Sequence, residues 1–491
     1  MKKQLYKAMK KYTLLLLLFG FFVQQGRANN LIIGAPTASG NTISFTIQWD
    51  NSWYVPSGPS NWDAIWVFVK RQHCDANTQT GWMHETLNST AANQTVTGSQ
   101  LQVDLATSDN LGVFVRRSAA GIGNIAQCTV TLTLSTPVNQ DNIAVYGIEM
   151  VYVPEGQFYI GDGASQNSFA DGAGHPILVT KAMQDAGIGS ASNYGGLGSS
   201  GSLPATFPLG YYGYYCMKKE ITCKLYCDFL NSLTYTQQIY LLDNPNAAPP
   251  VASPGDKINS RYGYNIEVVS QNALQPAVYG CDATDDNNWN QANDGLELPV
   301  CLRTQNLLAF LDWAALRPMT EFEFEKACRG PVYPVPNEFA WGTTDQSADY
   351  TIVNQFQTNE YSSTAPLGLS NMGGGGSELH RAGIEATSTS DRVHAGASYY
   401  GILNLTGSTF ERCVGGWGYD YSGFTAINGN GNITNQGTTN IIGWPIEDYK
   451  YVFRGGSLIY WGRNSSRDVH GDVNYSDPYG FAQGGRGVRS F

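Results

Sequence analysis

The stretch DWAALRPMTEFEFEKACRG (residues 312–330) says most about how this chain folds. Within it, Thr320 and Glu323 have the spacing of a capping box, which starts a helix by satisfying its first backbone N–H groups. Apolar residues with helical periodicity follow the box, and the same periodicity recurs in residues 221–233 and 304–316. We therefore predict three short helices that each bury one face.

Glycine-rich and polar loops surround these helices. Residues 195–204 (GGLGSSGSLP), 282–295 (DATDDNNWNQANDG) and 371–378 (NMGGGGSE) are rich in Gly, Asn, Asp and Ser. Such segments are typical of loops carried on a compact frame. The second part of the chain, from about residue 145 to residue 491, is therefore predicted to be a loop-rich α+β domain.

The first part of the chain has a different pattern. Short runs of alternating apolar and polar residues, bounded by Gly, Ser, Asn and Pro, recur between residues 29 and 140. This alternation is typical of half-buried strands, and their spacing is typical of an antiparallel sandwich. We predict an all-β sandwich domain over residues 29–140 with an accessory role, and we place the domain boundary in the polar segment 136–142.

The first 28 residues have the pattern of a secretory signal peptide. Lysines are followed by an apolar run at residues 12–23 and by the small residues Gly26 and Ala28 at the expected cleavage site. The run is too short for a membrane span, which needs about 20 apolar residues. We expect an exported protein, periplasmic or extracellular, with no membrane span in the mature chain.

Charge and composition narrow the class of partner. Only 14% of the residues are charged, against about 25% in an average soluble protein. The net charge of −11 becomes −17 when the six cations of the first 28 residues are removed. Such an acidic chain repels phosphate backbones, so we expect no nucleic-acid partner.

The nine cysteines and six histidines form no recognisable zinc or nucleophile motif. Cys223 and Cys227 are four residues apart, but no further pair follows at zinc spacing, so we interpret both as buried core residues. Cys74 and Cys128 are a candidate disulfide of the N-terminal part. The sequence has neither an HExxH zinc motif nor a GxSxG nucleophile elbow.

Seven motifs, taken in order, resemble the formylglycine-generating enzyme family, also called the sulfatase-modifying-factor domain. They are MVYVPEGQFYIGDG (150–163), KKEITCKLYCDFLNSL (218–233), DWAALRPMTEFEFEKACRG (312–330), FAWG (339–342), GILNLTGSTFERCVGGW (401–417), FRGGS (453–457) and GVRSF (487–491). The resemblance covers about residues 145–491 and implies the fold of that family, a C-type-lectin-like arrangement with little regular secondary structure. We interpret its charged motif residues as structural ties: Arg317, Glu321, Arg329, Arg454 and Arg489.

The resemblance also implies a chemistry that this sequence does not support. Enzymes of the family oxidise a sulfatase cysteine to formylglycine with molecular oxygen and a copper(I) ion held by two cysteine thiolates. Those cysteines lie three and eight residues beyond the serine of RGGS, where this chain has Tyr460 and Ser465. Neither a phenol nor a hydroxyl is a good copper(I) ligand, so we expect no copper oxidase. The alternative is a relocated thiol pair, Cys328 with Cys413.

A calcium site is a further expectation from the resemblance. In family members the segment matching GILNLTGSTFE winds around a calcium ion. Here it offers the Asn404 side chain, the carbonyls of Gly407 and Thr409, and the Glu411 carboxylate, which are the hard oxygens that calcium prefers. We expect a structural calcium at these four residues and name Asn354 as a weaker candidate for a second site.

The region that forms the catalytic surface in the enzymes is rich in aromatic and polar residues here. Aromatic faces with neighbouring polar groups suit sugars or peptide surfaces. We therefore predict an exported binding protein for a glycan or protein ligand. Its candidate contacts are Tyr460, Trp461, Arg463, Asn464, Arg467, Asp468, His470, Asn474 and Tyr475.

Three other hypotheses remain open from the sequence. The first is an enzyme of the family, either an oxidase of the formylglycine-generating type or a tailoring enzyme with other chemistry. The second is a surface receptor diversified by a retroelement, because such variable proteins resemble this family and vary in the same C-terminal segment. The third is a surface or assembly component that docks through the predicted sandwich.

Overall fold

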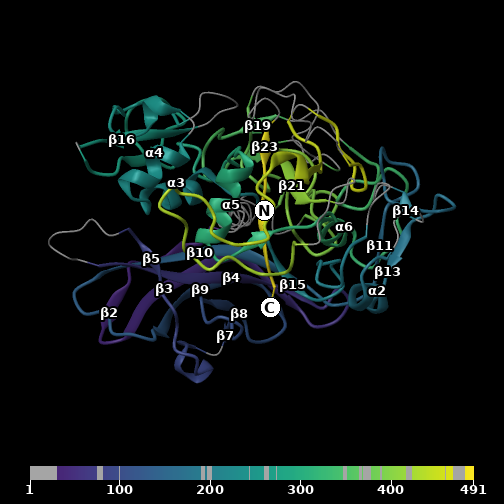
Figure 1. Cartoon of the computed structure of the whole chain (residues 1–491), viewed down its shortest axis with the longest axis horizontal. Coiled ribbons are helices and arrows are strands. Elements are labelled where there is room, and N and C mark those ends of the chain that lie inside the picture. The colour runs from purple at the N-terminus through teal and green to yellow at the C-terminus, as the bar shows by residue number, and fades with distance from the viewer. Residues whose placement is uncertain are drawn as a thin grey trace, which may run out of the picture.

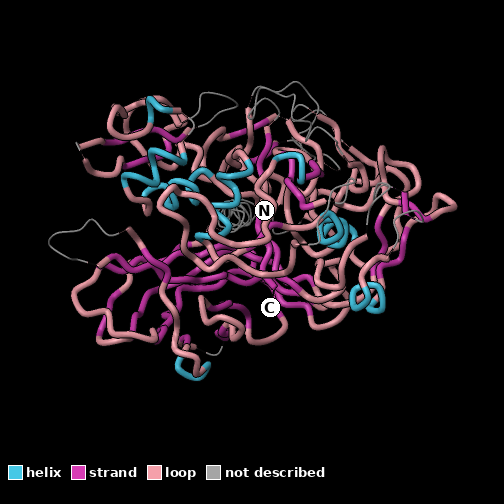
Figure 2. The backbone as a smooth tube through the Cα atoms, viewed as in Figure 1, coloured by secondary structure: helices cyan, strands magenta, loops and turns pink. Residues whose placement is uncertain are grey.

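The computed structural model describes residues 30–73, 81–98, 100–189, 194–195, 202–242, 244–258, 265–272, 274–346, 351–363, 368, 378–386, 390–415, 423–458, 460–467 and 482–490. The predicted signal peptide, residues 1–28, lies outside these ranges. Within them, no helix combines the length and the apolar character that crossing a membrane requires. Most of this part of the chain is strand or loop, and its helices are short (Figure 2).

The first strands of the chain build a buried core of their own. They are β1 (Ile32–Ile33), β2 (Thr37–Ser39), β3 (Thr42–Val55), β4 (Asn61–Gln72), β5 (Met83–His84), β6 (Thr95–Val96), β7 (Leu101–Leu105), β8 (Val113–Arg117) and β9 (Gly121–Thr133). In β3, Ile43, Phe45 and Ile47 are buried at alternate positions, as a strand with one buried face requires. They share one apolar cluster with Ile65 and Val67 of β4.

One sheet runs through both parts of the chain. Its order is β18-β24-β15-β10-β4-β3-β9-β6. The strand β10 (Asn142–Val153) pairs with β4 over ten residue pairs, and on its other side it pairs with β15 (Tyr214–Met217). Strands from before and after residue 140 are therefore direct neighbours. The division into two domains at residue 140 stays a prediction, and the structure adds that the two parts share a sheet.

The strand β4 is buried on both faces, which ties the two parts together. While Ile65 points into the N-terminal cluster, Trp66 points the other way and its Nε1 donates to the carbonyl of Ala314 at 2.9 Å. The buried Lys70 donates to the carbonyl of Trp313 at 2.7 Å. The first part of the chain thus supplies one wall of the main core.

Most of the helices lie on the side of the central sheet opposite β7 and β8 (Figure 1). The helices are α2 (Lys181–Ala186), α3 (Cys223–Asn231), α4 (Tyr235–Leu241), α5 (Thr304–Trp313) and α6 (Glu321–Arg329). The three predicted helices are confirmed as α3, α5 and α6, with Thr222 capping α3 and the Thr320–Glu323 capping box present in α6. The helix α5 ends earlier than predicted, because Ala315 has a φ of 55°.

Short strands complete the second part of the chain. They are β11 (Phe158–Ile160), β12 (Ala170–Asp171), β13 (Ile177–Val179), β14 (Tyr194–Gly195), β16 (Ile266–Ser270), β17 (Val278–Cys281), β18 (Arg317–Pro318), β19 (Ile352–Val353), β20 (Tyr361–Ser362), β21 (Phe410–Val414), β22 (Tyr451–Arg454), β23 (Gln483–Gly484) and β24 (Gly487–Ser490). The fold is mostly β and loop-rich with few helices, and the C-type-lectin-like assignment stays a prediction. In β22, β21 and β23 the chain forms a small sheet next to α6, and this sheet carries the candidate site.

Candidate ligand-binding site

The site is built on one face of α6. Glu321, Glu325 and Arg329 are spaced by four residues, so they lie along one face of this helix. All three side chains are buried, with 1% exposure or less. Because a buried charge is stable only when it is paired, this face needs partners of opposite charge. The C-terminal segment supplies them.

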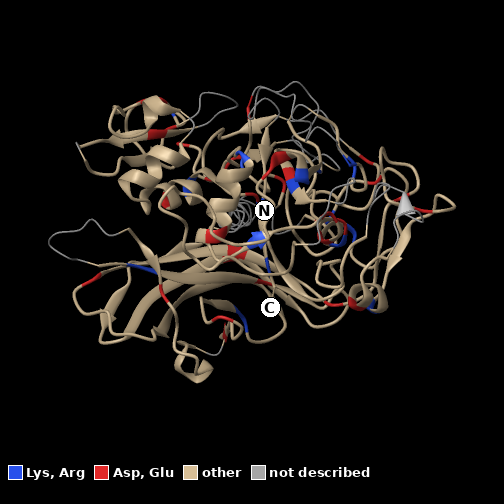
Figure 3. Ribbon diagram, in the orientation of Figure 1, with Lys and Arg blue, Asp and Glu red and all other residues tan. Residues whose placement is uncertain are grey.

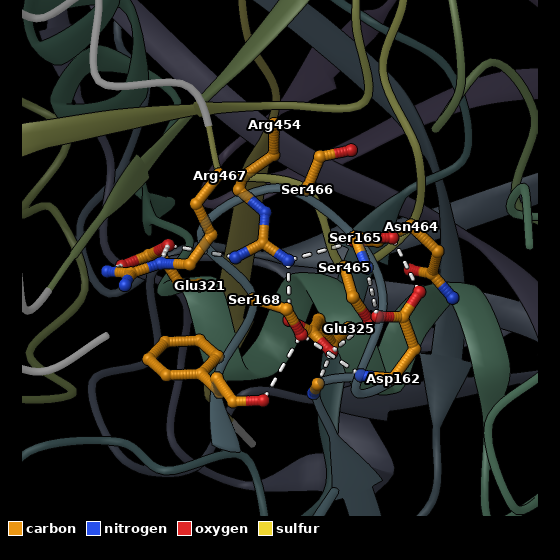
Figure 4. A network of polar contacts seen from close by, with 12 residues as sticks. Asp162, Ser165, Ser168, Glu321, Glu325, Arg454, Asn464, Ser465, Ser466 and Arg467 are labelled. Atoms are coloured by element: carbon orange, nitrogen blue, oxygen red, sulfur yellow. Dashed lines mark hydrogen bonds and ion pairs between the residues drawn. The ribbon is translucent and has the colours of Figure 1, made fainter. Parts of the chain in front are cut away.

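Arg454 and Arg467 form a buried ion-pair network with these carboxylates (Figure 4). Arg454, at the end of β22, donates to Glu321 Oε2 at 2.8 Å and to Glu325 Oε1 at 2.6 Å. Arg467 donates through Nε and Nη2 to the two carboxylate oxygens of Glu321, at 2.5 and 2.6 Å. This two-point arrangement fixes the guanidinium in one orientation. The network therefore anchors the segment around residues 454–467 to α6.

The pKa shifts of Glu321 and Arg454 both favour the charged form. Burial alone would raise the pKa of Glu321, but the guanidinium groups of Arg467 and Arg454 outweigh burial and lower it. Burial alone would lower the pKa of Arg454, but Glu325 and Glu321 outweigh it and raise the value. Charged residues are sparse over the fold as a whole (Figure 3), so this concentration of buried charge stands out.

Ser465 lies inside this network. Its Oγ accepts a hydrogen bond from Arg329 Nη2 at 2.7 Å and donates one to Glu325 Oε2 at 3.0 Å. At the other position where the resemblance expects a copper-binding cysteine, the Tyr460 ring packs against Phe410 with the ring centres 6.0 Å apart. A hydroxyl held between a guanidinium and a carboxylate, and a packed phenol, do not fit a copper(I) ion.

Asp162 joins two loops beside the network. Its Oδ1 accepts the backbone N–H of Ala164 and Ser165 at 3.0 and 2.7 Å, and its Oδ2 accepts the N–H of Asn337 at 2.8 Å. Burial would raise the pKa of Asp162, but these bonds and the one from the Ser165 hydroxyl outweigh burial and lower it. The loop that carries Gln166 is thereby fixed next to Asn337.

A pocket of about 220 Å³ opens between these loops and the C-terminal segment. The backbone comes close together at its floor, where a Cβ on Gly462 would lie 2.2 Å from the backbone N of Gly456. Gly455 and Gly456 also have φ values of 79° and 78°, which only glycine adopts readily. The pocket is lined by Gln166, Asn337, Phe410, Phe453, Gly455, Gly456, Trp461, Gly462, Arg463, Ser466 and Arg467.

The structure brings some of the predicted contact residues together and separates others. Trp461, Arg463 and Arg467 line the pocket, with 53% of Trp461 exposed. Tyr460 packs beside Phe410. Asn464 is buried, and its backbone carbonyl accepts a hydrogen bond from Arg454 Nη2 at 2.9 Å. The remaining four predicted contacts lie outside the described residues: Asp468, His470, Asn474 and Tyr475.

Two of these side chains have polar atoms that nothing in the described part of the chain satisfies. The side-chain N and O of Asn464 are buried without a hydrogen-bond partner there, and so is Arg463 Nη1. The guanidinium of Arg463 stacks over Phe339 at 3.9 Å from the ring centre, and burial lowers its pKa. Arg463 thus has a buried donor atom without a partner in the described part of the chain, while its residue lines the pocket with Trp461.

Sequence reasoning missed several residues of the network and of the pocket. Glu325 was not singled out, although its spacing of four from Glu321 and from Arg329 was a readable signal of a shared helix face. Gln166 and Asn337 come from loops with no periodicity. Asp162 brings these loops together, because it accepts the N–H of Asn337 and the N–H of Ser165, the neighbour of Gln166.

The structural interpretation of the charged motif residues agrees with the contacts observed. Arg317 pairs with Glu323, its Nη2 lying 2.6 Å from Oε1. Arg489 reaches across to the first part of the chain, where its Nη2 contacts both carboxylate oxygens of Asp109 at 2.6 and 2.7 Å. These arginines hold segments together and do not line the pocket.

The predicted calcium loop precedes and enters β21. The guanidinium group of Arg486, which lies between β23 and β24, is bound to this loop. Glu411 Oε1 accepts a hydrogen bond from Arg486 Nε at 2.6 Å, and Arg486 Nη2 donates to the Asn404 carbonyl at 3.1 Å. The Asn404 side-chain oxygen accepts the Gly383 N–H at 2.8 Å. The Thr409 N–H donates to Glu220 at 3.3 Å. The residues as arranged do not fit a calcium ion held by Glu411.

The other candidate calcium residues add no cation site. Gly407 turns the loop with a φ of 86°, and Asn354 lies in a turn with a φ of 58°. Among the described residues, no group of three or more His, Cys, Asp or Glu side chains is arranged to hold a metal ion. Calcium binding stays a prediction without support from the donor set.

Seven of the eight cysteines in the described part of the chain are buried. Cys223 and Cys227 are buried in the main core, as interpreted, and Cys227 Sγ lies 3.8 Å from Cys281 Sγ. Cys328 and Cys413, the alternative copper pair, lie in one apolar cluster, and burial raises the pKa of both thiols well above the usual range. Cys74 lies outside the described residues, so the Cys74–Cys128 disulfide stays a prediction.

Comparison with known protein families assigns the second part of the chain. Residues 139–490 match the sulfatase-modifying factor enzyme 1-like domain. The match covers more than half of the chain, so the chain belongs to this family. Comparison with curated proteins finds no match.

Proposed function

We propose that this protein is an exported binding module that uses a sulfatase-modifying-factor domain of C-type-lectin-like fold to recognise a glycan. The observation that carries the proposal is the pocket of about 220 Å³ with the half-exposed Trp461 at its edge and Arg463 beside it. It lies over an ion-pair network that has a structural role.

The chemistry of the pocket suits one polar ring. Trp461 offers an apolar face on which a sugar ring stacks, and such aromatic platforms give large contact area at low entropic cost. Four polar residues line the pocket with Trp461 and supply hydrogen-bonding groups there: Gln166, Asn337, Arg463 and Ser466. A volume of about 220 Å³ accommodates a single sugar unit or side chain and leaves the rest of a polymer outside.

The donor set argues for binding over copper-dependent oxidation. Tyr460 is packed against Phe410, and Ser465 is hydrogen-bonded to Arg329 and Glu325. Soft thiolates are the ligands that copper(I) prefers, and neither position offers one. Export, predicted from the first 28 residues, is consistent with a role at the cell surface or in the periplasm.

A glycan array with purified residues 29–491 tests the proposal. We expect specific binding, with Trp461→Ala weakening it about tenfold or more, as for an aromatic residue central to an interface. Arg463→Gln should weaken binding by a smaller factor. The matched control is Tyr240→Ala, which removes an exposed aromatic residue of α4 that does not line the pocket.

The outcomes separate the alternatives. Absence of glycan binding would contradict the proposal and favour a protein ligand. Copper-dependent oxygen consumption with a cysteine-containing, sulfatase-like peptide would contradict the claim that oxidase chemistry is absent. Equal loss of binding in Tyr240→Ala and Trp461→Ala would show that the pocket is not the binding site.

A further inference from the structure

The side chain of Arg486 binds the loop where the family resemblance places calcium. It lies between β23 and β24, and its side chain is buried. Its Nε lies 2.6 Å from Glu411 Oε1, Nη1 donates to the Leu403 carbonyl at 2.9 Å, and Nη2 donates to the Asn404 carbonyl at 3.1 Å. One guanidinium therefore binds a carboxylate and two carbonyls of the same loop.

The same guanidinium also joins this loop to the rest of the fold. Nη1 contacts the carbonyls of Met217 and Lys218 at 3.2 and 3.4 Å, next to the end of β15. Nη2 lies 4.0 Å from Glu220 Oε2, and Glu220 Oε1 accepts from the Thr409 N–H at 3.3 Å. Arg486 thus lies between two buried carboxyl groups and at the junction of three chain segments.

These contacts are of the type that a calcium ion would make. Calcium binds carboxylate and carbonyl oxygens at about 2.3–2.6 Å, so a calcium on Glu411 would lie within a few ångströms of the guanidinium. Like charges at that separation repel strongly in a buried environment. Arg486 and a calcium ion would therefore compete for the same side of Glu411, and in this structure Arg486 is bound there.

We infer that Arg486 takes the place of calcium in this chain, so that the loop of residues 401–411 is held by a covalently attached cation and needs no metal. Glu411 Oε2 is buried and has no hydrogen-bond partner among the described residues, and the carboxyl group of Glu220 is buried as well. Removing the guanidinium would therefore leave a buried acidic cavity with free oxygens, which is what calcium prefers.

Thermal unfolding of the full mature chain with millimolar calcium or with chelator tests this inference. We expect the wild-type Tm to be the same in both conditions. Arg486→Gln should lower Tm, and calcium should restore about 2–4 °C of that loss. The matched control is Arg489→Gln, which changes another buried arginine of the same C-terminal segment. This variant should also have a lower Tm, but calcium should not restore it.

Each result decides the inference. A wild-type Tm that falls on chelation would overturn it, as would a folded Arg486→Gln variant with no response to calcium. If Arg486→Gln does not fold, Arg486→Lys is measured in its place. The inference is supported if calcium changes neither the Tm of Arg486→Lys nor the Tm of the wild type. A calcium-dependent Arg486→Lys variant beside a calcium-dependent wild type overturns it.

Discussion

Individual buried charges explain much of how this chain is held together. Glu321 pairs with Arg454 and Arg467, and Glu325 pairs with Arg454. Removing one partner of such a pair leaves an uncompensated buried charge and is strongly destabilising. In a sequence of low overall charge, these buried ions hold α6 to the C-terminal segment.

Lys326 leads to a prediction about pH at this scale. It is buried on α6, and its Nζ donates to the carbonyls of Gly210 and Tyr211 at 2.6 and 3.0 Å. Burial lowers its pKa to about 7, more than Glu323 and Glu155 raise it. Between pH 7 and the ordinary lysine pKa of about 10.4, the unfolded chain binds a proton that the folded chain lacks, so stability rises with pH.

Chemical denaturation at several pH values checks this expectation. The contribution of Lys326 should increase the free energy of unfolding by on the order of 3 kcal/mol between pH 7 and pH 10. Lys326→Met should remove most of that increase. Lys181→Met, which changes a lysine with 56% exposure, should leave the pH profile as in the wild type. A wild-type profile that is flat over this range would refute the expectation.

At the scale of elements, α6 connects the core to the pocket. One of its faces carries Glu321, Glu325 and Arg329 to the network, while Phe324 and Ala327 face an apolar cluster with Cys413. The helix starts at a capping box, so its first turn is fixed by Thr320 and Glu323. The orientation of the pocket depends on this start.

Thr320→Ala should therefore affect both stability and binding. The Thr320 hydroxyl accepts the Glu323 N–H at 3.2 Å and donates to the Pro208 carbonyl at 2.9 Å. We expect a loss of about 1–2 kcal/mol in the free energy of unfolding, and weaker glycan binding. Thr234→Ala removes the corresponding capping box of α4, and it should cost about 1 kcal/mol without changing binding.

Urea unfolding and the glycan array measure the two effects. If both variants changed binding equally, the pocket would depend on global stability and not on the placement of α6. If Thr320→Ala left the free energy of unfolding unchanged, the capping contact would not stabilise this helix.

At the scale of the whole molecule, the two parts of the chain form one sheet and share a core. The strand β10 pairs with β4 on one side and β15 on the other. Trp66 of β4 contacts the Ala314 carbonyl, and Arg489 contacts Asp109. The part that sequence composition marks as a separate accessory domain is thus also a wall of the family domain.

A truncated chain of residues 139–490 should therefore not fold as in the intact protein. It would expose the β10 edge that pairs with β4 and the core surface that Trp66 covers. We expect aggregation or the loss of a cooperative thermal transition, measured by calorimetry and near-ultraviolet circular dichroism. A soluble truncated chain with the Tm of the intact protein would show that the shared sheet contributes nothing to stability.

Local patterns in the sequence determined the elements of this protein. The capping box of Thr320 and Glu323, the helical periodicity behind it and the short apolar runs between residues 29 and 140 predicted helices and strands that the structure contains. These features depend on neighbours within a few residues, so a sequence contains them directly. The family was also readable, because its motifs keep their order along the chain.

Only the tertiary structure decided how these elements combine. The pairing of β10 with β4, the meeting of Gln166 and Asn337 at Asp162, and the placement of Arg486 beside Glu411 join residues far apart in sequence. Such contacts depend on which buried charge finds which partner and which strand edge finds which neighbour. No local pattern contains that information, because the partner is chosen by packing and charge balance in the folded core.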